Sequence, residues 1–329
     1  PCPVAGDCGG CDWQHATLTE QRAIKGAVIV DAMRRIGGIE SIGGVAVADA
    51  VDVQAPDGGN GLDWRTRMRF ATDDAGVLGL RAVNSRLVTA ASTCPIAVPG
   101  IRAAVADVTD WPVDSEVVAA ESSSGEVYVH GVTGPRIFHE TVKHRIWEIP
   151  ATVFWQVHPA AATLLVDAVV ALAAPLPGET VLDLYSGAGL FAAFLGEAVG
   201  ETGSVAAVEG SSAAVTAARA NLTDLPQVRH HRSDVAAWLR HSKRRPVDIV
   251  VLDPPRAGAG RDVVRSVARR QPGRIVYVAC DPVALARDAK TFASLGYSLG
   301  QLVAYDIFPM TKHVECVALF ERTDKQPGA

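Results

Sequence analysis

Residues 180–191 read TVLDLYSGAGLF, an apolar strand that runs directly into a loop with two glycines. Three more apolar segments follow it, each separated from the next by a stretch of helical character: residues 204–210 (SVAAVEG), 247–255 (VDIVVLDPP) and 274–280 (RIVYVAC). Continuous apolar strands that alternate with helices predict a parallel sheet buried on both faces. The pattern begins near residue 150, so the second part of the chain is predicted to be an α/β domain.

Polar residues stand where these four strands end. They are Asp183 with the Gly187/Gly189 turn, then Glu209, Asp253 and Cys280. An open parallel sheet binds its ligands beyond the carboxyl ends of its strands. The sequence therefore predicts one site at this edge of the sheet.

The glycine loop indicates which ligand this edge holds. It lets the backbone approach a ligand closely, although a tight strand-to-helix turn would use the same glycines. It lacks the three-glycine dinucleotide fingerprint, which places a pyrophosphate on a helix N-terminus. Glu209 is placed to accept hydrogen bonds from a ribose diol, and Asp234 to meet an adenine amine. S-adenosylmethionine, a nucleoside without phosphates, is the predicted cofactor.

Cys280 ends its strand just before a helix that begins at Asp281-Pro282. A cysteine attacks as thiolate, which requires exposure and a favourable field, and a helix N-terminus favours negative charge. A buried, inert cysteine is the alternative, and it is the interpretation given to Cys316 in the last apolar run. Beside a methyl donor, Cys280 is predicted to be a nucleophile.

A thiolate and a methyl donor together fit methylation of carbon 5 of uracil or cytosine. Addition of the thiolate at carbon 6 makes carbon 5 nucleophilic, and a base must then remove the carbon-5 proton. Glu315, at the start of the segment ECVALF, is the candidate base, although a surface glutamate is the simpler alternative.

Residues 1–149 are predicted to form a separate α+β domain, followed by the catalytic domain over 150–323 and a tail over 324–329. Residues 17–38 have helical spacing with a threonine at the start and glycines at the end. Segments of strand character predict a sheet that is antiparallel: residues 64–70, 76–83, 86–92 and 125–132. Residues 297–323 predict a terminal hairpin.

Four cysteines lie outside the α/β domain. Cys2, Cys8 and Cys11 follow the spacing C-x5-C-x2-C, and Cys94 stands far downstream. Three clustered thiols and a distant fourth fit a four-thiolate metal site. Zinc and an iron–sulfur cluster are not separated by the spacing. Disulfides are the alternative, and they are rare in the cytoplasm, where the rest of the chain is expected to reside.

The net charge of −5 gives no sign of a nucleic-acid partner, but binding needs only a local basic surface. Two segments supply one: residues 64–70, with alternating arginines, and residues 229–245 (RHHRSDVAAWLRHSKRR). A solvated face is an equal alternative for each. No apolar run approaches the roughly 18 residues of a membrane span. The chain starts at Pro1 rather than Met, so a trimmed sequence is expected.

Several long motifs resemble the RNA 5-methyluridine methyltransferase family. They are VACDPVALARD, DIVVLDPPRAG and FPMTKHVECVALFER, together with residues 154–169 (FWQVHPAAATLLVDAV), which resemble the family's bridge into its catalytic domain. The four cysteines resemble those of its iron–sulfur members. The resemblance covers nearly the whole chain. It implies a class I S-adenosylmethionine-dependent (Rossmann-like) α/β methyltransferase domain preceded by a central α+β domain.

The resemblance also implies roles for individual residues. It makes Cys280 the nucleophile and Glu315 the proton acceptor, and it makes Cys2, Cys8, Cys11 and Cys94 ligands of a [4Fe-4S] cluster. It gives contacts with S-adenosylmethionine to five residues: Gln156, Tyr185, Glu209, Asp234 and Asp253. Leu190 departs from relatives that carry a polar residue there, so no contact is assigned to it.

The expected partner is a structured RNA, rRNA or tRNA, acted on by a cytoplasmic monomer. The target base must leave its stack to reach Cys280, and Phe308 and Pro309 are expected to wall its pocket. Arg65, Arg67 and Arg69, rather than residues 229–245, are the hypothesised phosphate-binding residues. Two other functions remain open: methylation of an exocyclic amine by the Asp253-Pro254-Pro255 loop, and non-catalytic RNA binding.

Overall fold

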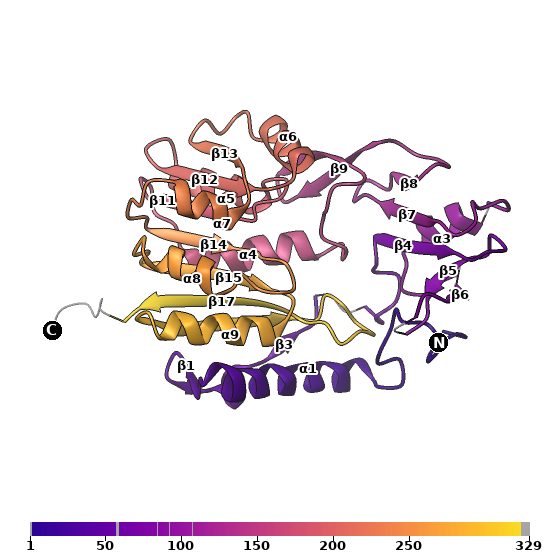
Figure 1. Ribbon diagram of the computed structural model, residues 1–329, viewed down its shortest axis with the longest axis horizontal. Coiled ribbons are helices and arrows are strands. Elements are labelled where there is room, and N and C mark those ends of the chain that lie inside the picture. Colours follow the sequence, from indigo (N-terminus) through magenta and orange to yellow (C-terminus); the bar gives the residue numbers. More distant parts are fainter. Residues whose placement is uncertain (1, 57–58, 84, 92, 107, 324–329) are drawn as a thin grey trace. The chain divides into compact units, whose positions relative to one another are not determined.

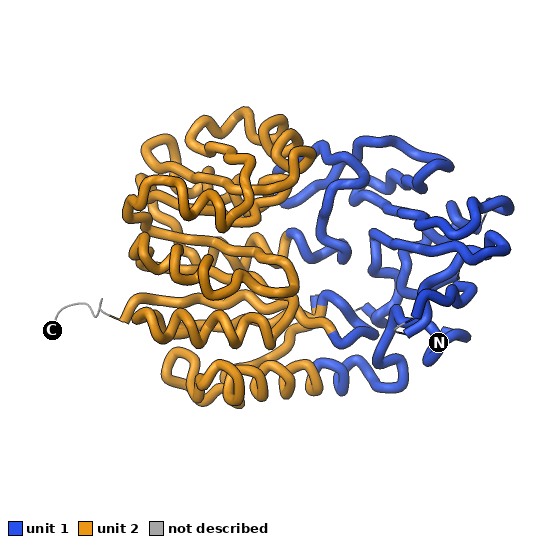
Figure 2. Tube along the Cα trace, viewed as in Figure 1, with its two compact units in different colours: residues 1–22, 56–162, 307–312 blue, residues 23–55, 163–306, 313–329 orange. Residues whose placement is uncertain are grey.

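The computed structural model describes residues 2–56, 59–83, 85–91, 93–106 and 108–323, so the predicted tail lies outside the described residues. The chain divides into two compact units (Figures 1 and 2). The first comprises residues 1–22, 56–162 and 307–312, and the second comprises residues 23–55, 163–306 and 313–329. This division differs from the single boundary expected near residue 150, because residues 23–55 join the second unit.

The second unit is built on an eight-stranded sheet with the strand order β13-β12-β11-β14-β15-β17-β16-β3. The bounds are β3 (Val53–Gln54), β11 (Thr180–Leu184), β12 (Ser204–Glu209), β13 (Val228–Arg232), β14 (Ile249–Leu252), β15 (Arg274–Ala279), β16 (Tyr297–Tyr305) and β17 (Glu315–Arg322). The first five strands in this order run parallel, which confirms the predicted parallel sheet. All four residues of β14 are buried, as expected for a strand covered on both faces.

From residue 161 onward, helices alternate with the strands of this sheet. They are α4 (Ala161–Ala173), α5 (Leu190–Val199), α6 (Ser212–Asn221), α7 (Val235–His241), α8 (Arg261–Ala268) and α9 (Pro282–Ala293). Apolar residues of α7, α8 and α9 form one buried cluster with strand residues such as Leu252 and Tyr277. The apolar faces of these helices, which recur with the 3.6-residue helical period, therefore pack against the apolar strands in one core.

The N-terminal helix α1 (Leu18–Ala32) confirms the helix expected over 17–38 and ends in a π-helical turn, η1 (Met33–Gly37), capped by Gly38 at φ 67°. Ile29 and Met33 are fully buried in the same core as α9. Short elements continue the chain to β3, which pairs parallel with β16: β1 (Ser41–Ile42), β2 (Val45–Ala46) and α2 (Val47–Ala50). This burial explains why residues 23–55 belong to the second unit.

The end of the chain forms the predicted hairpin of β16 and β17. Strand β17 lies between β16 and β15 and is antiparallel to both. Its register pairs Ala279 with Cys316. The last strand of the chain thus lies next to β15, the strand that Cys280 directly follows.

The first unit contains a five-stranded antiparallel sheet with the order β6-β5-β4-β7-β8, which confirms the expected antiparallel arrangement. Its elements are β4 (Arg67–Thr72), β5 (Leu78–Arg81), β6 (Val88–Ala90), α3 (Pro99–Ala106), β7 (Glu116–Glu121), β8 (Val127–Val129) and a hairpin of β9 (Ile137–Val142) with β10 (Arg145–Pro150). Strands β7, β9 and β10 were not expected from the sequence. No helix within the described residues is long and apolar enough to cross a membrane.

Candidate active site

The four predicted strand ends meet at one edge of the second unit's sheet. Strands β12, β11, β14 and β15 are consecutive neighbours and parallel, so their carboxyl ends share that edge. Asp183 lies near the end of β11 and Glu209 ends β12, while Asp253 and Cys280 directly follow β14 and β15. The predicted grouping of these residues is confirmed.

The loop after β11 has the backbone conformation that its glycines permit. Gly187 and Gly189 have φ values of 55° and 86°, and Tyr185 also has a positive φ, 65°. A Cβ atom at Gly189 would lie 2.9 Å from Leu222 Cδ1, whereas one at Gly187 would have no atom within 4 Å. Gly189 thus allows close packing beneath the loop, and Gly187 leaves open space beside it.

Asp183 is a buried carboxylic acid without a hydrogen-bonded partner. Its exposed fraction is 0%, and neither of its carboxyl oxygens forms a hydrogen bond to any described residue. Burial and, after it, the charge of Asp253 raise its pKa to about 8, while the nearby Ala192 N–H offsets this in part without forming a hydrogen bond of good geometry. A buried polar group of this kind requires a partner, and a cationic ligand group at this edge would supply one.

Glu209 and Asp234 already have structural partners. Glu209 accepts hydrogen bonds from the N–H groups of Gly187 at 3.1 Å and Ser211 at 2.6 Å. Asp234 is the N-cap of α7, since its Oδ1 accepts the N–H of Ala237 at 2.8 Å. Burial first, and then the negative charge of Asp234, raises the pKa of Tyr185 to about 12. The two carboxylates therefore shape the glycine loop and the helix that follows β13.

Cys280 and Glu315 come together through the sheet register. In this register Ala279 pairs with Cys316. The next residue of each strand direction, Cys280 on one side and Glu315 on the other, therefore occupies an adjoining position just beyond that pair. Cys280 is half-buried and Glu315 is 4% exposed. The charge of Glu315 is one of the causes that raise the pKa of the Cys280 thiol. Two residues separated by 34 others in sequence are thus electrostatic neighbours.

The prediction that the local field favours a Cys280 thiolate is wrong. Burial, and then the charge of Glu315, raises the pKa of the thiol to about 11, and Arg256 lowers it only in part. The N-terminus of α9 offers little compensation because the carboxylate of Asp281 caps it, accepting the N–H of Ala284 at 2.8 Å. The thiol is therefore protonated near neutral pH.

The other carboxyl groups at this edge also resist ionisation. Burial raises the pKa of Asp253 to about 7. The pKa of Glu315 is raised well above its ordinary value by burial and then by Asp253, whereas Arg256 lowers it. Arg256 thus influences both Cys280 and Glu315. No role for Arg256 was predicted from the sequence, in which its place in the segment DPPR is the one signal.

The loop that carries Arg256 is held by a buried pair. The Tyr277 hydroxyl donates to Asp288 Oδ2 at 2.7 Å, and the Ala259 N–H lies 2.8 Å from the same oxygen and 2.9 Å from the hydroxyl. The Gly260 N–H adds a bond of 3.2 Å to Asp288 Oδ2. Helix α9, which begins just after Cys280, therefore fixes the loop after β14.

Gln156, Phe308 and Pro309 belong to the first unit. Gln156 is half-buried in the segment between β10 and α4. Phe308 packs edge-on against Trp64, with ring centroids 6.3 Å apart, and Pro309 is buried. Their assignments to a cofactor contact and to a pocket wall stay predictions.

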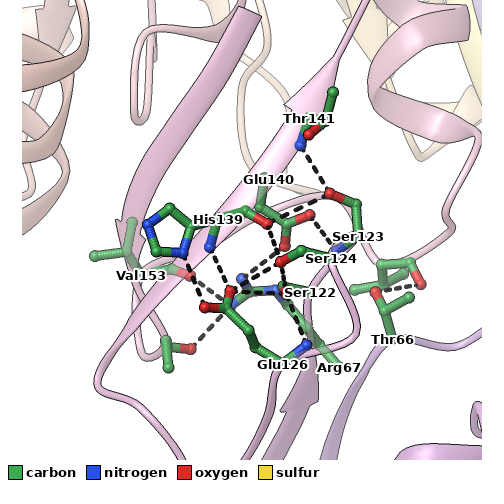
Figure 3. Close-up of polar contacts among 12 residues, drawn as sticks. Thr66, Arg67, Ser122, Ser123, Ser124, Glu126, His139, Glu140, Thr141 and Val153 are labelled. Atoms are coloured by element: carbon green, nitrogen blue, oxygen red, sulfur yellow. Dashed lines mark hydrogen bonds and ion pairs between the residues drawn. The ribbon is translucent and has the colours of Figure 1, made fainter.

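The hypothesis that three arginines of the first unit bind phosphate is wrong for Arg67. Its side chain is 12% exposed, and its Nη1 donates to the carbonyl oxygens of Ala151 and Val153 at 2.9 Å each. Its Nη2 lies 3.6 Å from Glu140, which accepts the N–H of Ser123 (Figure 3). The guanidinium thus connects β4 to the segment that follows β10 and to Glu140 of β9.

The two other arginines differ from Arg67. Arg69 is exposed and lies 3.1 Å from Glu116, whose charge opposes its own. The half-buried Arg65 donates from Nε to the Arg67 carbonyl oxygen at 3.2 Å. Arg69 thus has an acidic neighbour, and the Nε of Arg65 is engaged by a backbone carbonyl oxygen.

The four N-terminal cysteines are in the first unit and form no disulfides. Burial first, and then the charges of Cys94, Cys8 and Cys2, raises the pKa of Cys11 to about 11, so the four thiols are electrostatic neighbours. Cys8 and Cys94 are buried. Within the part of the chain that the structure describes, however, no group of three or more His, Cys, Asp or Glu side chains is arranged to hold a metal ion.

Comparison with protein families gives two matches in the second half of the chain. Residues 241–323 match the model described as tRNA (uracil-5-)-methyltransferase, and residues 149–276 match a methyltransferase small domain. An uncharacterized RNA methyltransferase from Streptomyces coelicolor is 38% identical over 99% of this chain and 79% of its own length. One from Bifidobacterium longum is 34% identical over 98% of this chain and 80% of its own.

Among solved structures, the crystal structure of the tRNA (uracil-54, C5)-methyltransferase of Pyrococcus abyssi, in complex with S-adenosyl-L-homocysteine, superposes with a TM-score of 0.73. It shares 23% identity and covers 96% of this chain and 86% of its own. The superposition shows a common fold, a mixed α/β architecture with a class I S-adenosylmethionine-dependent methyltransferase domain.

Proposed function

The chain belongs to the family of RNA (uracil-5-)methyltransferases, and we propose that it methylates carbon 5 of a specific uridine in a structured RNA through a covalent bond between Cys280 and carbon 6. The observation that carries this proposal is the sheet register, which brings the Cys280 thiol and the Glu315 carboxyl group to adjoining positions at the carboxyl edge. An exocyclic-amine methyltransferase needs no such pair.

In the proposed reaction the Cys280 thiol loses its proton to solvent, and the thiolate bonds to carbon 6, which makes carbon 5 nucleophilic. Carbon 5 then takes the methyl group of S-adenosylmethionine, whose carbon–sulfur bond breaks and releases S-adenosylhomocysteine. The Glu315 carboxylate removes the proton from carbon 5, and the electron pair of that bond restores the ring double bond and expels the sulfur. Burial raises the pKa of Glu315, so its carboxylate, once ionised, is a stronger base for the carbon-5 proton.

S-adenosylmethionine, the second substrate, supplies a methyl group on a positively charged sulfonium. We assign its binding to Tyr185, Glu209, Asp234 and Asp253 at the sheet edge. The fit is supported by the open space at Gly187 and by the unpartnered carboxyl group of Asp183, which suits a cationic group. Asp183 is therefore added to the contacts expected from the sequence.

We further propose that Cys2, Cys8, Cys11 and Cys94 hold a [4Fe-4S] cluster. Four free thiols form a suitable donor set. Burial, and after it the charges of other thiols in the set, raise the pKa values of Cys8, Cys11 and Cys94, although the side chains require rearrangement to bind a cluster. The cluster would tie the N-terminal segment to the first unit. Anaerobically purified protein should contain about four iron and four sulfide ions per chain, and a Cys94→Ala variant should lose them.

RNA that contains 5-fluorouridine tests the mechanism. A base cannot remove fluorine from carbon 5 in the way that it removes a proton, so the last step is blocked. Wild-type protein should therefore form a covalent adduct between Cys280 and the RNA that survives denaturation. Cys280→Ser should form none and should transfer methyl groups more than about 100-fold more slowly. Cys316→Ala, which removes the other thiol of the second unit, should retain the adduct.

Other outcomes would exclude the proposal. Methyl transfer without an adduct would indicate amine methylation, and RNA binding without transfer would indicate a non-catalytic factor. Mapping 5-methyluridine in tRNA and rRNA from cells with and without the gene would identify the substrate.

A further inference from the structure

One surface of the second unit carries a concentration of positive charge. It is formed by the outermost strand β13, helix α7 and the loop that follows it (Figure 1). Its exposed cations, here called the basic surface, are Arg229, Arg232, Arg240, Lys243, Arg244 and Arg245. Asp234 is the one acidic residue in the segment 229–245, and it caps α7.

The cations of the basic surface are unpaired and lie close together in the sequence. None of the six forms an ion pair with any residue that the structure describes. By contrast, Arg34 pairs with Glu40, Arg69 with Glu116 and Arg274 with Glu179. Six unpaired cations thus lie within 17 residues of a chain whose net charge is −5.

The positive charges of this region also act on one another. Burial, and then the charge of Arg244, lowers the pKa of Arg270. Burial, and then Arg229, lowers the pKa of His231. Repulsion among neighbouring cations would be relieved by a bound anion.

The backbone beneath the basic surface is fixed. Arg270 donates from Nη2 to the Leu239 carbonyl oxygen at 3.2 Å and to Ser242 Oγ at 2.6 Å, and its guanidinium lies over the Trp238 ring at 5.6 Å. The end of α7 is therefore held in place, and the loop with Lys243, Arg244 and Arg245 begins from a rigid support.

The basic surface starts at the edge of the sheet that carries the candidate active site. Arg232 ends β13 and pairs in register with Glu209, whose carboxylate holds the glycine loop. From there α7 returns toward the other edge, because a helix that follows a parallel strand runs back across the sheet. An extended polyanion bound at the site can thus continue along this side.

We propose that the basic surface binds the phosphate backbone of the substrate RNA outside the target loop. This inference rests on the proposed function, and it reverses the hypothesis that the arginines of residues 64–70 do so. Phosphate contacts fix position and register without reading bases. The basic surface therefore contributes affinity for a large folded RNA and adds little for a short stem–loop.

The test compares Lys243→Gln/Arg244→Gln/Arg245→Gln with the charge-matched control Arg34→Gln/Arg35→Gln/Lys290→Gln, which alters exposed cations of the same unit. Binding of an unmodified tRNA transcript is measured against salt concentration. The basic-surface variant should bind at least about fivefold more weakly at low salt, and its slope of log K against log salt should fall by about 2. The control should change neither quantity substantially.

Equal losses in both variants, or none in either, would overturn the proposal. So would undiminished RNA binding accompanied by lost binding to phosphatidylserine vesicles, which would assign the surface to a membrane. Failure of the proposed function gives a different result from failure of this inference. If the proposed function is wrong, wild-type protein binds the transcript but methylates no uridine in RNA from cells that lack the gene.

Discussion

At Cys280 opposing influences act on one thiol. Burial and the carboxyl groups of Glu315 and Asp253 raise its pKa to about 11, whereas Arg256 lowers it. Since only the thiolate attacks carbon 6, the fraction of thiolate limits the first step of the proposed reaction. Arg256 therefore influences the nucleophile without taking part in bond formation.

We expect the rate of Cys280 alkylation by iodoacetamide to rise about tenfold per pH unit between pH 7 and 9. Below the pKa of the thiol, the thiolate fraction rises by the same factor. Arg256→Gln should lower the rate at each pH, since it removes the cation that opposes the pKa rise. Mass spectrometry of the Cys280 peptide measures both. Arg261→Gln, a change at the exposed start of α8, should leave the profile intact, and a pH-independent rate would contradict the argument.

Among the elements, β17 has the largest effect on the site. It is the last strand of the chain, yet it lies between β15 and β16 in the sheet. Its antiparallel direction places its first residue, Glu315, at the carboxyl edge of the parallel strands. A parallel strand in that position would have its first residue at the opposite edge.

The loop after β14 depends on the Tyr277–Asp288 pair. Tyr277→Phe removes the hydroxyl that lies 2.7 Å from Asp288 and 2.9 Å from the Ala259 N–H. We expect a cost of about 1–2 kcal/mol in the free energy of unfolding. We also expect a lower kcat and slower Cys280 alkylation, because Arg256 is less firmly placed.

Tyr297→Phe is the matched control for that change. Its hydroxyl also donates a buried hydrogen bond, to the Pro272 carbonyl oxygen at 3.0 Å, at the start of β16. It should lower stability by a similar amount and leave the alkylation profile of Cys280 unchanged. If both variants shift the profile equally, the pair has only a structural role.

For the whole molecule, the buried carboxyl groups make folding stability depend on pH. The pKa of Asp183 is raised from 3.8 to about 8, and that of Glu315 is also raised. A carboxyl group with a raised pKa stabilises the folded state while it is protonated, and this contribution is lost as pH rises through the folded-state pKa. We expect the melting temperature of the full chain to fall by several degrees between pH 5 and pH 8.

Asp183→Asn should remove much of this slope, because an amide keeps the shape and has no proton to lose. Differential scanning calorimetry across the pH range measures the effect. Asp262→Asn, at an exposed position in α8, is the control. A wild-type melting temperature that rises steadily from pH 5 to 8 would show that ionisation of Asp183 carries no such cost.

The elements of the second unit followed from local pattern to a large extent. The apolar runs predicted β11, β12, β14 and β15, and the same pattern placed their polar ends at one edge. Strands β9 and β10 were not predicted because their residues largely alternate between buried and exposed and charged side chains interrupt them. Strand β7 has only four apolar residues, 117–120, between two glutamates. Short alternating strands give a weaker local signal than continuous apolar runs.

The sequence by itself determined the parallel sheet, the glycine loop and the chemical types at its edge, because hydrophobic period and turn residues act over a few neighbours. Only the tertiary structure decided that β17 brings Glu315 beside Cys280, that residues 23–55 join the second unit and that Arg67 is buried. Burial and the approach of distant charges also decided the raised pKa of Cys280. These properties depend on pairing and desolvation across the chain, which no local pattern encodes.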